Sequence, residues 1–187
     1  MKILQIVHFM TNNLFQAKDF DVKSNQSFFF DNNIWMFLYC PIANFNESKQ
    51  KTISTLFEKI LSRNCIIIVN SLIISEFCNA YLRLDFNLWK EETKNPLANF
   101  KNDYFTSKRA IDTRQNIANT VKNKILKISE KHPDSFNALN FDNIFTSYEF
   151  LDYNDSIIYN ECKNKNWILV SDDADFVKFN DITIIKI

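Results

Sequence analysis

Short runs of bulky apolar residues recur along this sequence, and each is flanked by segments with helical spacing. The runs cover residues 28–30, 65–69, 167–170 and 182–185. Continuous apolar runs without alternation are typical of strands that are buried on both faces of a parallel sheet. Apolar residues three and four apart predict helices over 48–62, from Ser71 to about 89, and over 100–131. This alternation predicts an α/β fold, a three-layer α/β/α sandwich with a central, mainly parallel sheet.

The length of the chain, 187 residues, is that of one ordinary domain. Hydrophobic residues make up 46% of it, which is enough for a buried core. The first predicted strand begins at Phe28, so residues 1–27 are expected to form an N-terminal extension and residues 28–187 the folded domain.

Two residue types exclude several kinds of site. Glycine is absent, although phosphate-binding loops, the dinucleotide fingerprint and the nucleophile elbow all require it. The cysteines Cys40, Cys65, Cys78 and Cys162 are scattered and form no Cys-x-x-Cys pair, so no zinc site is expected. Their apolar neighbours indicate reduced thiols in the cytoplasm. Neither a signal peptide nor a membrane-spanning run is expected.

The charges balance overall but are unevenly distributed. Twenty-two basic residues match 22 acidic ones. Residues 101–131 contain eight Lys or Arg and three acids, whereas residues 134–181 contain ten acids and three Lys. Any nucleic-acid partner would therefore meet a local basic patch and not a global field. Two ordinary solvated faces would give the same pattern.

Four acids follow or flank the predicted strands. Asp31 and Asp173 come at strand ends, Glu76 lies in the first turns of the helix after the second strand, and Asp155 begins the helix before the third. The carboxyl ends of parallel strands meet at one edge of a sheet, so we expect the four to converge. Carboxylates about 5 Å apart repel by roughly 3 kcal/mol per pair. Mg²⁺ or Mn²⁺ would neutralise them, and a metal with open coordination positions makes a nuclease plausible.

Each acid also has a purely structural interpretation. Asp31 precedes two asparagines and can form a turn. Asp152 and Asp155 have the spacing of a capping box, and residues 171–175 read as a solvated turn. Glu76 can be a surface residue on an otherwise apolar helix. Only the joint pattern favours a site.

The sequences around the four acids resemble, in order, the acidic motifs of PIN-domain ribonucleases, a family that includes VapC-like toxins. They are Phe-Phe-Phe-Asp-Asn-Asn-Ile-Trp at 28–35, Ser-Glu-Phe at 75–77, Asp-Tyr-Asn-Asp-Ser-Ile-Ile at 152–158, and Ile-Leu-Val-Ser-Asp-Asp-Ala-Asp-Phe at 168–176. The likeness covers about residues 28–187. Two features depart from the family pattern: Asn32 stands where Thr or Ser is common, and the usual glycine before the last strand is missing.

The resemblance implies a flavodoxin-like topology and a Mg²⁺- or Mn²⁺-dependent endoribonuclease. The metal-binding, catalytic acids would be Asp31, Glu76, Asp155 and Asp173. Supporting polar residues around them would be Asn33, Ser171, Asp152 and Asp175. The family also implies an RNA substrate, an antitoxin protein as partner and a homodimer. Compared with a compact toxin, this chain has a helical insert at about 85–140.

Basic residues in the insert are candidates for holding RNA phosphates. They are Lys108, Arg109, Arg114 and Lys122. The main alternative is a PIN-like module that binds RNA or protein without cleaving it. A haloacid-dehalogenase-like phosphatase also begins with an Asp after a strand, but it needs a second Asp where this sequence has Asn33.

Overall fold

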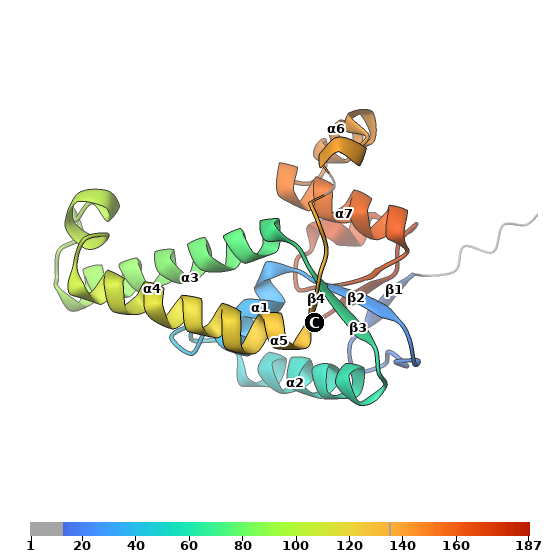
Figure 1. The fold of residues 1–187 in the computed structure, drawn as a ribbon, viewed down its shortest axis with the longest axis horizontal. Coiled ribbons are helices and arrows are strands. Elements are labelled where there is room, and N and C mark those ends of the chain that lie inside the picture. The colour runs from blue at the N-terminus through green and yellow to red at the C-terminus, as the bar shows by residue number, and fades with distance from the viewer. Residues whose placement is uncertain (1–12, 135) are drawn as a thin grey trace, which may run out of the picture.

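The computed structural model describes residues 13–134 and 136–187, and in it one six-stranded parallel sheet organises the chain (Figure 1). The strand order is β1-β6-β5-β2-β3-β4, and every neighbouring pair is parallel. The strands are β1 (Leu14–Gln16), β2 (Ser27–Phe30), β3 (Ile66–Val69), β4 (Glu130–Lys131), β5 (Ile168–Ser171) and β6 (Ile184–Lys186).

The central strands form the core because their side chains are apolar on both faces. Phe28, Phe29 and Phe30 of β2 are all buried. In register, Phe28 lies opposite Ile67 of β3 and Ile168 of β5. The apolar run at residues 28–30, which was predicted to form a strand buried on both faces, therefore lies in the middle of the sheet.

Helices cover both faces of the sheet. Figure 1 shows α2 below it and α7, with α6, above it, so the predicted three-layer α/β/α fold is confirmed. The helices are α1 (Asn32–Tyr39), α2 (Glu47–Ser62), α3 (Ser71–Glu92), α4 (Lys108–Thr120), α5 (Leu126–Ile128), α6 (Phe141–Tyr148) and α7 (Tyr153–Lys165). Among the described residues, no helix has the length and apolarity needed to cross a membrane.

The outer half of α3 and α4 lie side by side and project away from the sheet as a helical arm (Figure 1). The predicted single helix over 100–131 was wrong. Two π-helical turns, η1 (Phe100–Tyr104) and η2 (Val121–Ile125), interrupt it, and α4 begins anew after Ser107. The hydroxyl of Ser107 accepts a hydrogen bond from the Ala110 N–H at 3.2 Å, which caps the new helix.

A buried carboxylate fixes the arm. Asp85 of α3 accepts hydrogen bonds from the Tyr104 and Thr113 hydroxyls, both at 2.6 Å. The Arg109 guanidinium donates to the same carboxylate at 2.6 and 2.9 Å. This bidentate contact holds the pKa of Asp85 below its usual value against the opposing effect of burial.

Part of the predicted N-terminal extension belongs to the sheet. β1 pairs with β6 at the edge, and Ala17, Phe20 and Val22 are buried in the core. Residues 1–12 lie outside the described residues. Asn70 caps α3, because its Oδ1 accepts a hydrogen bond from the Ile73 N–H at 3.1 Å.

Candidate metal centre

Asp31 lies at the carboxyl end of β2, where the chain turns into α1. Its backbone N–H donates to the carbonyl of Val170 in β5 at 3.0 Å, which continues the sheet by one residue. Its Oδ1 accepts a hydrogen bond from the N–H of Asn32 at 2.6 Å, so Asp31 also caps α1. Asp31 therefore does have the structural role expected of a turn residue. The hydrogen bond from Asn32 also orients its carboxylate at the edge of the sheet.

Two of the predicted supporting residues join the first acidic motif to the last. Ser171 donates its hydroxyl hydrogen to Asp31 Oδ2 at 2.6 Å, and Asn33 Nδ2 donates to the same oxygen at 2.5 Å. The Ser171 hydroxyl also accepts from the N–H of Asp173 at 2.9 Å. Asn33 Oδ1 accepts from the N–H of Asp172 at 3.1 Å. These bonds hold the β2 and β5 ends together.

Glu76 projects from the second turn of α3 and is held by a residue that the sequence interpretation missed. Asn154 Nδ2 donates to Glu76 Oε1 at 2.7 Å. Asn154 lies inside the motif Asp152-x-x-Asp155, so its position was visible in the sequence, but its partner 78 residues away was not.

Asp155 occupies the first turn of α7. The predicted cap is present: Asp152 Oδ1 accepts from the N–H of Asp155 at 2.9 Å. In the last motif the Asp173 carboxylate is itself the acceptor, because its Oδ1 accepts a hydrogen bond from the backbone N–H of Asp175 at 2.8 Å. The carboxylate of Asp175 itself pairs with Lys178 at 3.2 Å.

The four acids Asp31, Glu76, Asp155 and Asp173 are brought into one electrostatic neighbourhood, which we call the acid cluster. Burial, followed by the charges of Asp31, Asp152, Asp173 and Glu76, raises the pKa of Asp155 to about 8. Burial, more than the nearby charges of Asp31 and Asp152, raises the pKa of Glu76 to about 7. Burial also raises the pKa of Asp31 despite its hydrogen bonds.

The four acids offer carboxylate oxygens, which are the ligands that hard divalent cations prefer, and their negative charges act on one another. In residues 13–134 and 136–187, no three His, Cys, Asp or Glu side chains are arranged to hold a metal ion. Binding would therefore require these side chains to move closer together.

Lysines next to the cluster were not predicted. Lys49 of α2 pairs with both carboxylate oxygens of Asp172, at 2.6 and 2.7 Å, and Lys186 of β6 donates to the Asp172 carbonyl. The charge of the Asp172 carboxylate is thereby neutralised. Its neighbour Asp173 makes no such pair with Lys49. Neither lysine carried a sequence signal, because Lys49 lies 123 residues and Lys186 lies 14 residues from Asp172.

A hollow of about 720 Å³ adjoins the acid cluster. It lies between α1, the loop after α1, α3 and the loop after β5. The residues that line it are Asn32, Asn33, Met36, Phe37, Ala43, Asn44, Phe45, Leu84, Asp172, Asp173 and Ala174.

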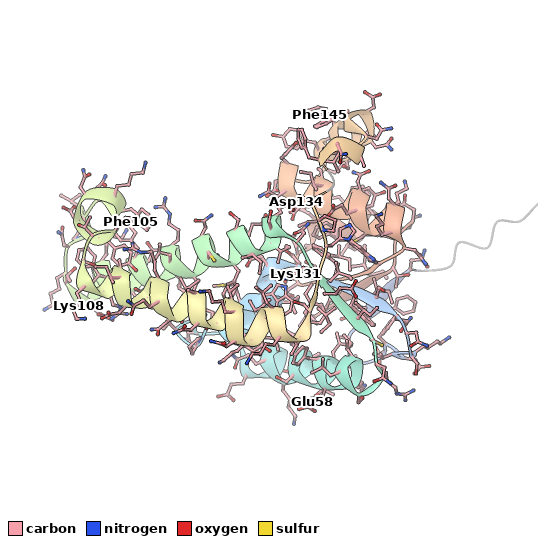
Figure 2. The ribbon with its side chains drawn as sticks, viewed as in Figure 1. Glu58, Phe105, Lys108, Lys131, Asp134 and Phe145 are labelled. Atoms are coloured by element: carbon pink, nitrogen blue, oxygen red, sulfur yellow. The ribbon has the colours of Figure 1, made fainter. Side chains whose placement is uncertain are left out.

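The predicted RNA-binding residues lie on the arm and have different surroundings. Arg109 is engaged by Asp85, and Arg114 donates to the carbonyl of Phe105 at 2.7 Å. Lys108, at the outer end of the arm in Figure 2, makes an exposed pair with Asp112 at 3.3 Å. Lys122 is exposed on η2. Their role toward RNA stays a prediction.

Comparison with known proteins gives a likeness of fold. No protein-family model matches the chain, and no curated protein matches it. A chain from the crystal structure of VapBC2 from Rickettsia felis, bound to a DNA fragment from their promoter, is structurally similar. The TM-score is 0.53 at 14% sequence identity, over 87% of this chain and 99% of that chain. This similarity supports the PIN-like fold.

Proposed function

We propose that this protein is a metal-dependent endoribonuclease that hydrolyses RNA phosphodiester bonds at the acid cluster. The observation that carries the proposal is the convergence of four carboxylates from four distant segments, seen in the charges that act on Asp155. Such a cluster opposes folding unless a cation or protons neutralise it. The PIN-like fold supports the same reaction, because the four segments are those that resemble the motifs of PIN-domain ribonucleases.

The chain's own residues would hold the cluster in place. Mg²⁺ or Mn²⁺, when bound, supplies an activated water and polarises the phosphate. Ser171 and Asn33 orient the carboxylate of Asp31, and Asn154 orients that of Glu76. Fixed supporting hydrogen bonds of this kind orient metal-binding groups and increase metal affinity.

A cleavage assay tests the proposal. Purified protein is incubated with end-labelled RNA and Mn²⁺, beside the Asp31→Asn variant and the matched control Asp142→Asn, an exposed acid on α6. We expect cleavage by the wild type and the control, and a loss of at least about a hundredfold in Asp31→Asn. Full metal-dependent cleavage by a folded Asp31→Asn variant would refute the assignment.

We also propose that the nuclease acts as the toxin of a type II toxin–antitoxin pair, with an antitoxin protein as its partner. The resemblance of the motifs to VapC-like nucleases and the likeness to a chain of VapBC2 support this role. Expression of the wild type alone should arrest growth, while Asp31→Asn should not. Equal growth of both strains at equal protein levels would contradict the toxin role.

A second candidate is a PIN-like module that binds RNA or protein without cleaving it. One observation favours it: the described acids are not spaced to hold a metal ion. The same assay separates the two candidates, because a module of this kind leaves labelled RNA intact at every Mn²⁺ concentration.

A further inference from the structure

We propose that the hollow beside the acid cluster binds an unpaired nucleobase of the substrate strand, next to the phosphate that is cleaved. The inference deepens the proposed nuclease function and rests on it. The first support is that the hollow and the acid cluster share residues. Asp173 is a member of the cluster, Asn33 donates a hydrogen bond to Asp31 of the cluster, and both residues line the hollow. A strand whose phosphate lies at the acids would place a neighbouring nucleotide there.

The wall of the hollow is aromatic. The rings of Phe37 and Phe45 have centroids 4.3 Å apart and are inclined by 48°, and both side chains are half-buried. Met36 and Leu84 add apolar surface. Bases bind single-stranded nucleic-acid sites by stacking on such rings. The volume of about 720 Å³ is within the usual range of small-molecule sites.

Amides supply the polar part of the lining. Asn32 and Asn44 both line the hollow, and Asn44 is exposed. No side-chain hydrogen bond of Asn44 occurs within the described parts of the chain. An amide offers both a donor and an acceptor, which matches the edge of a base.

The charge at the rim allows a polyanion to approach. Three acids follow β5 within four residues, at Asp172, Asp173 and Asp175, and together they would repel phosphate. Lys49 neutralises Asp172, and its side chain remains 43% exposed. Because Asp172 lines the hollow, the Lys49 ammonium group that it binds lies next to the lining of the hollow.

A hollow that holds one base favours single-stranded RNA as the substrate. A base can enter the hollow only when it is unpaired and unstacked, so the site favours single-stranded RNA, or loops, over duplex.

Binding is measured without cleavage. Fluorescein-labelled hexaadenylate is titrated with protein in EDTA, and fluorescence anisotropy gives the dissociation constant. The comparison probes are a fully abasic oligomer of the same length and an RNA duplex. Phe45→Leu keeps an apolar side chain but removes the ring, Phe45→Tyr restores a ring, and Phe145→Leu makes the same change at the outward-facing ring on α6 seen in Figure 2.

We expect Phe45→Leu to weaken binding of hexaadenylate about 5- to 100-fold, with Phe45→Tyr and Phe145→Leu close to the wild type. The fully abasic oligomer and the duplex should each bind more weakly than hexaadenylate to a similar degree. Equal binding of intact, abasic and duplex probes, or equal effects of Phe45→Leu and Phe145→Leu, overturns the inference.

A kinetic measurement keeps this inference separate from the nuclease proposal. With Mn²⁺ and single-stranded RNA, Phe45→Leu should raise KM and change kcat little, because the ring contacts the base and not the reacting phosphate. If Phe45→Leu cleaves RNA with an unchanged KM, the base-binding proposal is overturned and the nuclease proposal is not. Base-dependent binding without any cleavage overturns the nuclease alone.

Discussion

Ser171, at the end of β5, donates a 2.6 Å hydrogen bond to the carboxylate of Asp31, which lies 140 residues earlier at the end of β2. Because the two strands are parallel neighbours, the residues that follow them meet at one edge. The hydroxyl stabilises the ionised form of Asp31 and so opposes the effect of burial on its pKa.

Replacement of Ser171 by Ala should therefore raise the pKa of Asp31 and weaken cleavage. We expect metal-dependent activity to fall about 10- to 100-fold, as is typical when a supporting hydrogen bond is removed from a metal site. The measurement is cleavage of labelled RNA as a function of Mn²⁺ concentration. Ser62→Ala is the matched control, because the Ser62 hydroxyl only donates to the Lys59 carbonyl on α2. Wild-type activity in Ser171→Ala at every Mn²⁺ concentration would show that the hydrogen bond has no part in the reaction.

Asp155 should destabilise the metal-free protein at neutral and alkaline pH. Its folded-state pKa, about 8, lies above the ordinary value of 3.8 for an Asp side chain. A raised folded pKa gives a stability contribution that is complete below the unfolded pKa and is lost as pH rises through the folded one. Asp155→Asn cannot ionise, so in EDTA it should melt above the wild type at pH 8 and near it at pH 4.

The size of this effect is modest because Asp155 is only partly buried. A gain of about 1 kcal/mol corresponds to roughly 2–4 °C in a domain of this size. Thermal melts from pH 4 to pH 8 provide the measurement, with Asp142→Asn on α6 as the control. A melting difference that is the same at both ends of the pH range would contradict the role of ionisation.

Mn²⁺ should stabilise the wild type by drawing the four carboxylates together. A ligand present at a hundred times its dissociation constant adds about 2.7 kcal/mol to the free energy of unfolding. We expect a melting shift of several degrees at millimolar Mn²⁺ that is absent in Asp155→Asn. Equal shifts in the two proteins would place the bound metal elsewhere, and no shift in either would favour the module that binds without cleaving.

The sheet could be predicted from the sequence because it depends on local patterns, and the same patterns led to the four candidate acids. Residues 28–30 and 167–170 are uninterrupted apolar runs, and the acids follow such runs or begin helices. β4 was not predicted because Glu130–Lys131 is short and polar. It is a strand only because it pairs with β3, which is distant in the sequence. The π-helical turn η2 was not predicted, because the apolar residues Ile117, Val121 and Ile125 keep a four-residue spacing through it.

The partners of the site residues were harder to predict than the residues themselves. Asn33 and Ser171 were expected to orient the acids from the resemblance, and they do contact Asp31. Asn154 and Lys49 depend on how α3, α7 and α2 are placed in three dimensions, and nothing in their local sequence specifies this. The spacing between the carboxylates likewise depends on helix placement, so sequence could predict their convergence but not their coordination distance.

Arg109 is expected to act mainly on stability, because it compensates a buried charge on the arm. Asp85 is 1% exposed and receives hydrogen bonds from Arg109, Tyr104 and Thr113. Replacement of Arg109 by Ala leaves this carboxylate without its cation, and loss of one partner of a buried pair costs about 3–5 kcal/mol. Lys108→Ala removes an exposed pair and should cost about 1 kcal/mol or less.

Urea unfolding of the two variants measures these costs, and pH supplies an independent check. The pKa of Asp85 is lowered in the folded protein, so its stabilising contribution is present above the unfolded value of 3.8 and is lost as pH falls through the folded pKa. The difference between wild type and Arg109→Ala should therefore be full at pH 7 and shrink below pH 3.8 as Asp85 becomes protonated. An equal, small loss in Arg109→Ala and Lys108→Ala at pH 7 would show that the Asp85 contact is not structural, and would leave Arg109 available for RNA.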